Sequence, residues 1–347
     1  MNSNIVWIDI LRIIGTFSVV WIHSAAPLLY KFNKISIMNW WVGNIYDSMA
    51  RMCVPLFFMI SGFLLLNKSE APSVFFQKRL YKVVLPLIAW SILYILWKHY
   101  IEGKGSPSFY IFFSLVITPA YFHLWFLYAI IGIYLFMPIL RIITQHSSNE
   151  TLYYFVFLWF VAVSVIPFFE MLTGIKSVID LQMISGYIGY FVLGLLLGEV
   201  KVNAKFFILS VVVFIVSVFA TAFSTYYFTV ERGVFVGYFY GHLTPNVIVM
   251  SISFFVFIKY LSENSSIINN AKAKKIIEPL SAASFGIYLV HAMVLYILSR
   301  GYFGLRLNAF TADAYYSIPA TAISTYIVSF IIVYFLQSIP FIKKIAP

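Results

Sequence analysis

The sequence predicts an all-α, polytopic integral membrane protein with about ten transmembrane helices, built as a single domain over residues 1–347. Of the 347 residues, 62% are hydrophobic and 10% are charged, whereas about 25% of residues in soluble domains are charged. The mean hydropathy is +0.92. The 36 phenylalanines and 25 tyrosines suit lipid-facing surfaces and interfacial belts. This composition excludes an ordinary soluble core.

Ten apolar stretches have the length that a bilayer-spanning helix needs, about 18–25 residues. We expect these spans at 6–29, 44–66, 82–100, 122–140, 152–170, 183–199, 205–229, 243–261, 280–299 and 316–338. The apolar stretch 109–118 is too short to cross, so a re-entrant or interfacial segment is expected there. The polar stretch 262–275 is expected to be a linker between two spans.

The distribution of lysine and arginine predicts that both termini are cytoplasmic, and we expect the protein to lie in the plasma (inner) membrane. With the amino terminus inside, 14 of the 23 basic residues fall on the cytoplasmic side, as the positive-inside rule requires. The net charge of +11 is partly this bias, and anionic membrane lipids are its natural partners. No nucleic-acid partner is needed to explain it.

The first span carries two ionisable side chains, Arg12 and His23, eleven positions apart. Eleven helical steps of about 100° bring the second side chain to within about 20° of the first, and separate the two by about 16 Å along the axis. Intramembrane ionisable groups are costly and usually functional. The alternative is that Arg12 marks the cytoplasmic rim and that His23 is a hydrogen-bonded packing residue.

The loop before the third span concentrates three basic residues, Lys78, Arg79 and Lys82. Arg79 and Lys82 are i,i+3 neighbours, and such a pair can bind a polyanion such as a nucleotide phosphate. Ordinary positive-inside charge explains the cluster equally simply. Because helices one to three are sequential, Arg12 could line the same vestibule.

Further polar groups fall inside other spans. Arg51, near the outer end of the second span, is either a snorkelling anchor or a substrate contact. His123 and Trp125 open the fourth span, consistent with an interfacial aromatic belt. In the ninth span Ser284, Tyr288 and His291 share one helix face, so His291 is either a structural histidine or part of a cavity facing His23. The single cysteine, Cys53, rules out a cysteine-based metal cluster, and no metal is expected.

At these residues the chain resembles the acyltransferase 3 family of membrane acyltransferases. The resemblance consists of an R-x10-H motif at Arg12 and His23, VPLFFMISGF at 54–63, the basic stretch at 78–82, HLWFL at 123–127 and GIYLVH at 286–291. The branch it most resembles comprises the O-acetyltransferases of enterobacterial common antigen. The basic motif departs from the family pattern, since lysines stand at 78 and 82 where arginines are frequent.

The resemblance implies transfer of an acyl group, usually acetyl from acetyl-CoA, to a hydroxyl of an extracytoplasmic glycan or lipid-linked sugar. Arg12, Arg79, Lys82 and Lys78 would then hold the donor. His23, whose reference pKa of about 6.5 leaves it largely neutral at pH 7, would act as general base; a covalent acyl-histidine stays open. Asp9 either orients Arg12 or caps the helix. Ser61 and Tyr288 are candidate oxyanion donors.

Two other functions fit the same span pattern. A transporter or exporter of a glycan or lipid-linked sugar would also have about ten spans with broken helices, although no internal repeat is visible in the sequence. A scaffold or lipid-binding protein without chemistry is the third possibility, and it requires no reactive role for His23.

Overall fold

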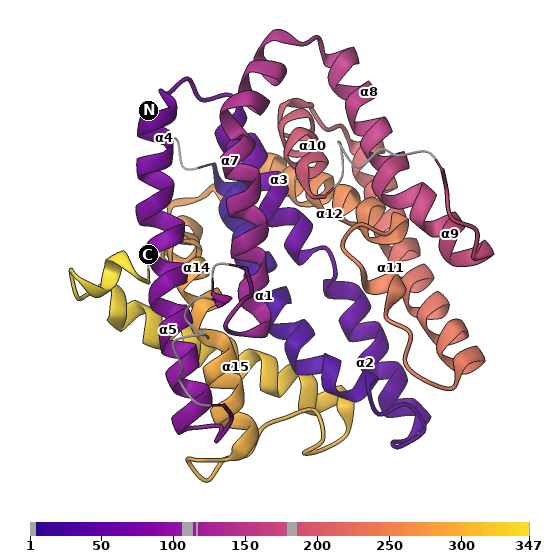
Figure 1. The fold of residues 1–347 in the computed structure, drawn as a ribbon, viewed down its shortest axis with the longest axis vertical. Coiled ribbons are helices and arrows are strands. Elements are labelled where there is room, and N and C mark those ends of the chain that lie inside the picture. Colours follow the sequence, from indigo (N-terminus) through magenta and orange to yellow (C-terminus); the bar gives the residue numbers. More distant parts are fainter. Residues whose placement is uncertain (1–4, 106–113, 116, 179–185, 347) are drawn as a thin grey trace.

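The computed structural model describes residues 5–105, 114–115, 117–178 and 186–346, and within this part the fold is a bundle of helices (Figure 1). The expected all-α membrane fold is confirmed. Nine helical stretches of the described residues are long and apolar enough to cross a membrane. They are Val6–Leu29, Ile37–Leu66, Pro72–Tyr100, Phe122–His146, Asn149–Thr173, Ala204–Arg232, Tyr238–Asn264, Ala271–Arg300 and Ala314–Gln337.

Several of these stretches combine shorter elements. The second contains α2 (Ile37–Ala50) and α3 (Cys53–Leu66), and the third contains α4 (Pro72–Arg79), the π-helix η1 (Leu80–Val84) and α5 (Leu85–Tyr100). In Figure 1 the third runs as one long helix along the left edge of the bundle. The remaining helices are α1 (Val6–Leu29), η2 (Phe122–Leu124), α7 (Trp125–His146), α8 (Asn149–Phe160), η3 (Val161–Val165), α9 (Ile166–Thr173), α10 (Ile188–Glu199), α11 (Ala204–Arg232), η5 (Tyr238–Tyr240), α12 (Pro245–Asn264), α13 (Ser266–Asn269), α14 (Ala271–Arg300), α15 (Ala314–Gln337) and η6 (Ile342–Lys344).

The structure differs from the sequence prediction at the expected span 183–199 and at the expected linker 262–275. The sixth expected span, 183–199, appears as the 12-residue helix α10, too short by itself to cross a bilayer, and residues 183–185 lie outside the described part. The expected re-entrant segment, 109–118, also lies mostly outside it. The expected linker 262–275 is largely helical instead: α13 and α14 begin at once because Ser265 and Asn270 cap them, accepting hydrogen bonds from the backbone N–H of Ile268 and Ala273.

Helix α1 lies at the centre of the bundle. It packs against α2, α3, α12, α14 and α15, so side chains on most of its faces meet protein rather than lipid. Among them, Leu11, Thr16 and Val20 are fully buried. The position of α1 explains how a membrane helix can carry an arginine and a histidine.

Helices α3 and α10 cross with their backbones almost in contact. A Cβ on Gly62 would overlap the backbone of Phe191, and a Cβ on Gly194 would overlap the backbone of Met59. Small residues at such a crossing allow the close helix packing that stabilises membrane bundles. The crossing holds α3, which carries several residues of the site described below.

We predict that Gly62→Ala destabilises the protein by about 1–3 kcal/mol, since the added methyl forces the α3 and α10 backbones apart. The midpoint of SDS-induced unfolding in mixed micelles measures this change. Gly132→Ala in α7 is the matched control, because no described atom lies within 4 Å of a Cβ built there. Equal midpoints for the two variants would contradict the tight crossing.

Candidate active site

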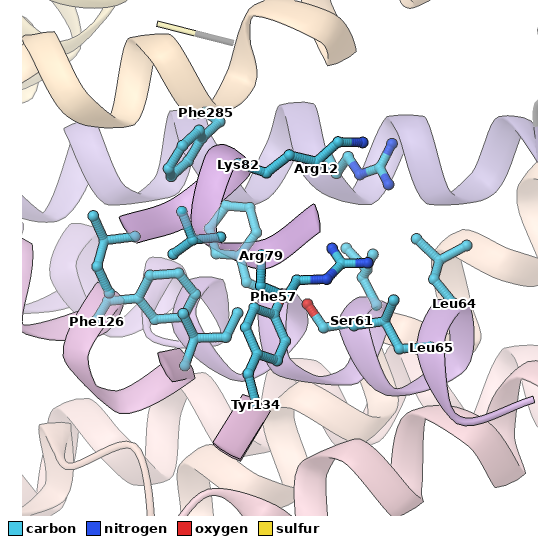
Figure 2. A pocket seen from close by; sticks show the side chains of 14 residues that line it. Arg12, Phe57, Ser61, Leu64, Leu65, Arg79, Lys82, Phe126, Tyr134 and Phe285 are labelled. Atoms are coloured by element: carbon cyan, nitrogen blue, oxygen red, sulfur yellow. The ribbon is translucent and has the colours of Figure 1, made fainter. Parts of the chain in front are cut away.

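The first cavity of the site is a pocket of about 230 Å³ lined by Arg12, Arg79 and Lys82, which we call the basic pocket. These residues come from α1, the end of α4 and η1, and π-helical turns are frequent at functional sites. Figure 2 shows the charged ends of the three side chains gathered on one side of the pocket, and the rings of Phe126 and Phe285 on the other. The pocket therefore combines cationic and apolar walls.

The three cations of the basic pocket differ in their partners. Arg12 donates to Asp9 at 3.2 Å, and the same carboxylate oxygen accepts a hydrogen bond from Ser281 at 2.6 Å. The Arg79 guanidinium lies over the rings of Phe75 and Tyr134, 5.1 and 5.4 Å from their centroids. Its Nε is buried and has no hydrogen-bond partner in the described part of the chain. Arg79 is thus placed to bind an anion within the pocket.

Lys78 does not line the basic pocket. Its ammonium group donates to Glu70 at 2.6 Å, and Glu70 also accepts from the buried Arg141 at 3.0 Å. Arg141 in turn donates to the backbone oxygen of Leu65 at 2.9 Å. This ion-pair cluster ties the end of α3 to α4 and α7, so its cations serve the fold, while Arg79 and Lys82 face the cavity.

A second cavity of about 400 Å³ adjoins the basic pocket, and we call it the linking pocket. It shares Arg12, Lys82 and Phe126 with the basic pocket and adds Ser284 and Tyr288 of α14. Phe57 and Phe285 also line both pockets, and the wall of the linking pocket is mostly apolar. The linking pocket extends the cavity from the three cations toward the middle of α14.

A third cavity of about 150 Å³, the histidine pocket, is lined by His23, Arg51, His123 and His242. It shares Phe126 and Tyr288 with the linking pocket, so these two side chains stand in the walls of both. Four of the six histidines of the chain gather around this region, because His291 stacks against His23 with ring centroids 5.4 Å apart. The ring of His123 lies edge-on to His291 at 4.8 Å.

The histidine rings are held by packing more than by hydrogen bonds. His291 Nδ1 bonds to the backbone oxygen of Tyr288 at 2.7 Å, while its Nε2 is buried without a partner in the described residues. His242 lies flat on Trp125, with centroids 5.7 Å apart. The Tyr288 hydroxyl donates to the backbone oxygen of His123. The cluster therefore offers imidazole nitrogens that a substrate proton could reach.

Arg51 points into the protein instead of snorkelling to the membrane surface. Its guanidinium forms an ion pair with the fully buried Asp47 and lies over the ring of Tyr240, 4.1 Å from the centroid. The side chain is only 14% exposed. Tyr240 is itself buried and donates to Asn44. Arg51 is thus the permanent cation of the histidine pocket within the described residues.

The fourth cavity, of about 350 Å³, we call the aromatic groove. Its aromatic lining consists of Tyr30, Tyr121, Phe122 and Tyr296, and its polar lining includes Ser299 and Asn308. His23 lines both the aromatic groove and the histidine pocket. The imidazole of His23 therefore lies in the walls of two cavities. One is the histidine pocket, which adjoins the linking pocket, and the other is the aromatic groove.

The structure thus brings most of the predicted site residues together around adjoining cavities, with Arg12, Arg79, Lys82 and Ser61 in the basic pocket and His23, Arg51, His123, Trp125 and Tyr288 in the histidine pocket. Sequence reasoning missed His242, Asp47, Phe126 and the Glu70–Arg141 pair. His242 lies in the loop before α12, where no helical stripe marks it. Only the rarity of an acid inside an apolar stretch could have indicated Asp47.

This arrangement defines a polytopic membrane protein with a cation-lined cavity that leads to a cluster of histidines within the bundle. The chain belongs to the acyltransferase 3 family, whose model, described as an acyltransferase domain, matches residues 5–337. The resemblance seen in the sequence is thereby confirmed for the family, and the protein is a multi-pass membrane acyltransferase. No curated protein and no solved structure matches the chain.

The ion pairs of Glu70 predict a pH-dependent stability. The hydrogen bond from Lys78, together with that from Arg141, lowers the pKa of Glu70 from 4.5 to about 2. Because the folded-state value lies below the unfolded one, ionised Glu70 stabilises the fold above pH 4.5, and this contribution is lost as the pH falls toward 2. Glu70→Gln should melt at a lower temperature than wild type at pH 7, with the gap closing in acid. Glu231→Gln at the exposed end of α11 is the control, and a gap that does not change with pH would contradict the assignment.

Proposed function

We propose that the protein transfers an acyl group, acetyl above all, from cytosolic acetyl-CoA to a hydroxyl of an extracytoplasmic glycan or lipid-linked sugar, with His23 as general base. One observation carries the proposal. His23 lines both the histidine pocket and the aromatic groove, and the histidine pocket adjoins, through Phe126 and Tyr288, the cavities that hold Arg12, Arg79 and Lys82. A donor and an acceptor could therefore meet at one imidazole from two sides.

The basic pocket suits the phosphate end of an acyl-CoA. Three cations converge there, and Arg79 has a buried N–H without a partner in the described residues, which matches phosphate oxygens. The positive-inside distribution of lysine and arginine supports a cytosolic opening for this end. The mostly apolar linking pocket would hold the pantetheine arm and carry the thioester toward the histidine pocket.

The reaction that we propose needs one proton relay. His23 takes the proton of the acceptor hydroxyl as its oxygen forms a bond to the thioester carbonyl carbon, and the carbonyl electron pair moves onto oxygen. When this tetrahedral intermediate collapses, the C–S bond breaks, the ester remains on the acceptor, and the thiolate of CoA takes the proton from the imidazolium. His291, stacked on His23, would keep the ring in its orientation.

We assign the binding of the acceptor to the aromatic groove. Its tyrosine and phenylalanine rings suit the apolar faces of sugar rings, while Ser299 and Asn308 can hydrogen-bond hydroxyl groups. The segment between α14 and α15 contributes Asn308 to it. Tyr240 is not available for such stacking, since it is buried beneath Arg51. The sugar of an enterobacterial-common-antigen-like glycan is one acceptor of this class.

His23→Ala should lower acetyl transfer by about 10²–10⁴-fold, the usual contribution of general acid–base catalysis, while acetyl-CoA binding stays within twofold of wild type. Transfer is measured with [acetyl-¹⁴C]acetyl-CoA and the extracted membrane glycolipids of the source cell, and binding by calorimetry. His146→Ala is the control, since His146 is exposed at the end of α7. Undiminished transfer by His23→Ala would refute the base assignment, and transport of the glycan without CoA release would favour the exporter alternative.

Arg79→Ala and Lys82→Ala should each raise the dissociation constant of CoA about tenfold or more, because a hydrogen bond to a charged group contributes about 1.5–3 kcal/mol. Lys78→Ala is the matched comparison from the same basic stretch, since its ammonium group is bound by Glu70 outside the pocket, and its effect should be smaller. Calorimetric titration of CoA against each purified variant measures the difference. A larger loss with Lys78→Ala than with Arg79→Ala would contradict this view of the donor site.

A further inference from the structure

We propose that Arg51 is a catalytic residue that binds the oxyanion formed at the thioester carbonyl, and that Asp47 and Tyr240 are the positioning residues that aim its guanidinium into the histidine pocket. The inference rests on the proposed function and adds the group that the acyl-transfer mechanism still lacks. The negative charge that develops on the carbonyl oxygen needs preorganised donors, and such donors are usually the largest single contribution to catalysis of this kind.

The two oxyanion donors suggested by the sequence are poorly placed for this task. Ser61 lines the basic pocket and is not among the residues that line the histidine pocket. The Tyr288 hydroxyl does border that pocket, but it already donates to the backbone oxygen of His123. Arg51 shares the histidine pocket with His23 and presents a planar guanidinium with five N–H donors.

The guanidinium of Arg51 keeps free donors after its structural contacts are made. Nε and Nη2 bond to one oxygen of Asp47, and Nη1 donates to the backbone oxygen of Tyr240 at 3.4 Å. Each contact occupies one hydrogen, and a guanidinium has five N–H donors. Within the described residues, these contacts leave one N–H on Nη1 and one on Nη2 for a ligand in the pocket.

The orientation of Arg51 is held from several sides. Asp47 is fully buried, the Tyr240 ring lies 4.1 Å from the guanidinium carbon, and Tyr240 is anchored by donating to Asn44. Asn44 is held in turn by α11, since its amide donates to the backbone oxygen of Ala222 at 2.9 Å. A side chain fixed in this way loses little entropy when the oxyanion forms.

The energetics of the Asp47–Arg51 pair also favour a role in chemistry. A buried ion pair contributes little or nothing to stability beyond what apolar side chains of similar size would give. Inside a membrane-spanning bundle such groups are costly, and one oxygen of Asp47 has no hydrogen-bond partner among the described residues. The pair is therefore costly, and its Arg51 lines the histidine pocket, which is the placement that a role in chemistry requires.

The test compares Arg51→Lys, Arg51→Ala and Asp47→Asn with wild type. Arg51→Lys keeps the charge but loses the planar donors, and it should reduce kcat for acetyl transfer to membrane glycolipids about 10²–10³-fold, the usual cost of removing an oxyanion donor. Its KM for acetyl-CoA and its calorimetric CoA affinity should stay within twofold. Guanidinium ion added at millimolar concentration should restore part of the activity of Arg51→Ala, which a purely structural loss would not allow.

Asp47→Asn tests the positioning role. It should lower kcat less than Arg51→Ala, since the guanidinium remains but is less firmly oriented. Arg232→Ala, at the exposed end of α11, is the control and should leave kcat unchanged. Melting temperatures establish that each variant is folded before its kinetics are compared.

The outcomes separate this inference from the function on which it rests. Inactive His23→Ala with fully active Arg51→Lys and Arg51→Ala would overturn the oxyanion assignment alone. An active His23→Ala would overturn the proposed function. Weakened CoA binding by Arg51→Lys at an unchanged kcat would overturn the inference as well, because it would make Arg51 a donor-binding residue. Lower kcat with unchanged KM and partial rescue by guanidinium would support it.

Discussion

The cost of placing ionisable side chains within a membrane governs the architecture of this protein. Arg12 and His23 are tolerated on α1 because five other helices pack against that helix and both side chains line cavities within the bundle. The other polar groups of the site lie on helices or loops that pack around α1 or around its neighbours. The cavities are thus a consequence of the requirement that every such group be enclosed.

The hydrogen-bond partners of the cations inside the bundle distinguish the cations that stabilise the fold from those that we assign to function. Lys259 donates to the backbone oxygens of Leu197, Gly198 and Val200 at 2.6–3.1 Å, so it binds the carboxyl end of α10 as a structural cap. Arg141 performs a similar task between Leu65 and Glu70. Arg79 and Arg51 instead retain donors that face cavities. The structural and the functional cations therefore differ mainly in whether protein acceptors occupy all of their hydrogen-bond donors, and less in how deeply they are buried.

The chemistry that we propose depends on distributing donor and acceptor between separate cavities. The cations of the basic pocket and the histidines lie at different levels of the bundle, separated by the linking pocket and by Phe126 and Tyr288. A charged nucleotide can remain at the cation-lined end while only an uncharged thioester arm travels inward. No phosphate group then has to be buried near the imidazoles, where its desolvation would be most costly.

The sequence by itself determined the helical membrane class, the bounds of several spans to within a few residues, and the stripe that joins Arg12 to His23, because apolar run length and helical period are local properties. The helices that contain the expected spans 44–66, 82–100 and 280–299 begin earlier than expected, at Ile37, Pro72 and Ala271. It also indicated the family through short ordered motifs. It could not distinguish Lys78 from Arg79 and Lys82. The partner of Lys78 is Glu70, eight residues earlier in the chain, and the position of the Glu70 carboxylate depends on how the chain turns between α3 and α4. It could not find His242 or the role of Asp47, because neither lies on a polar stripe. Only the tertiary structure, by packing α2 and the loop before α12 beside α1, brought His242, and Arg51 with its partner Asp47, to the cavity that His23 lines.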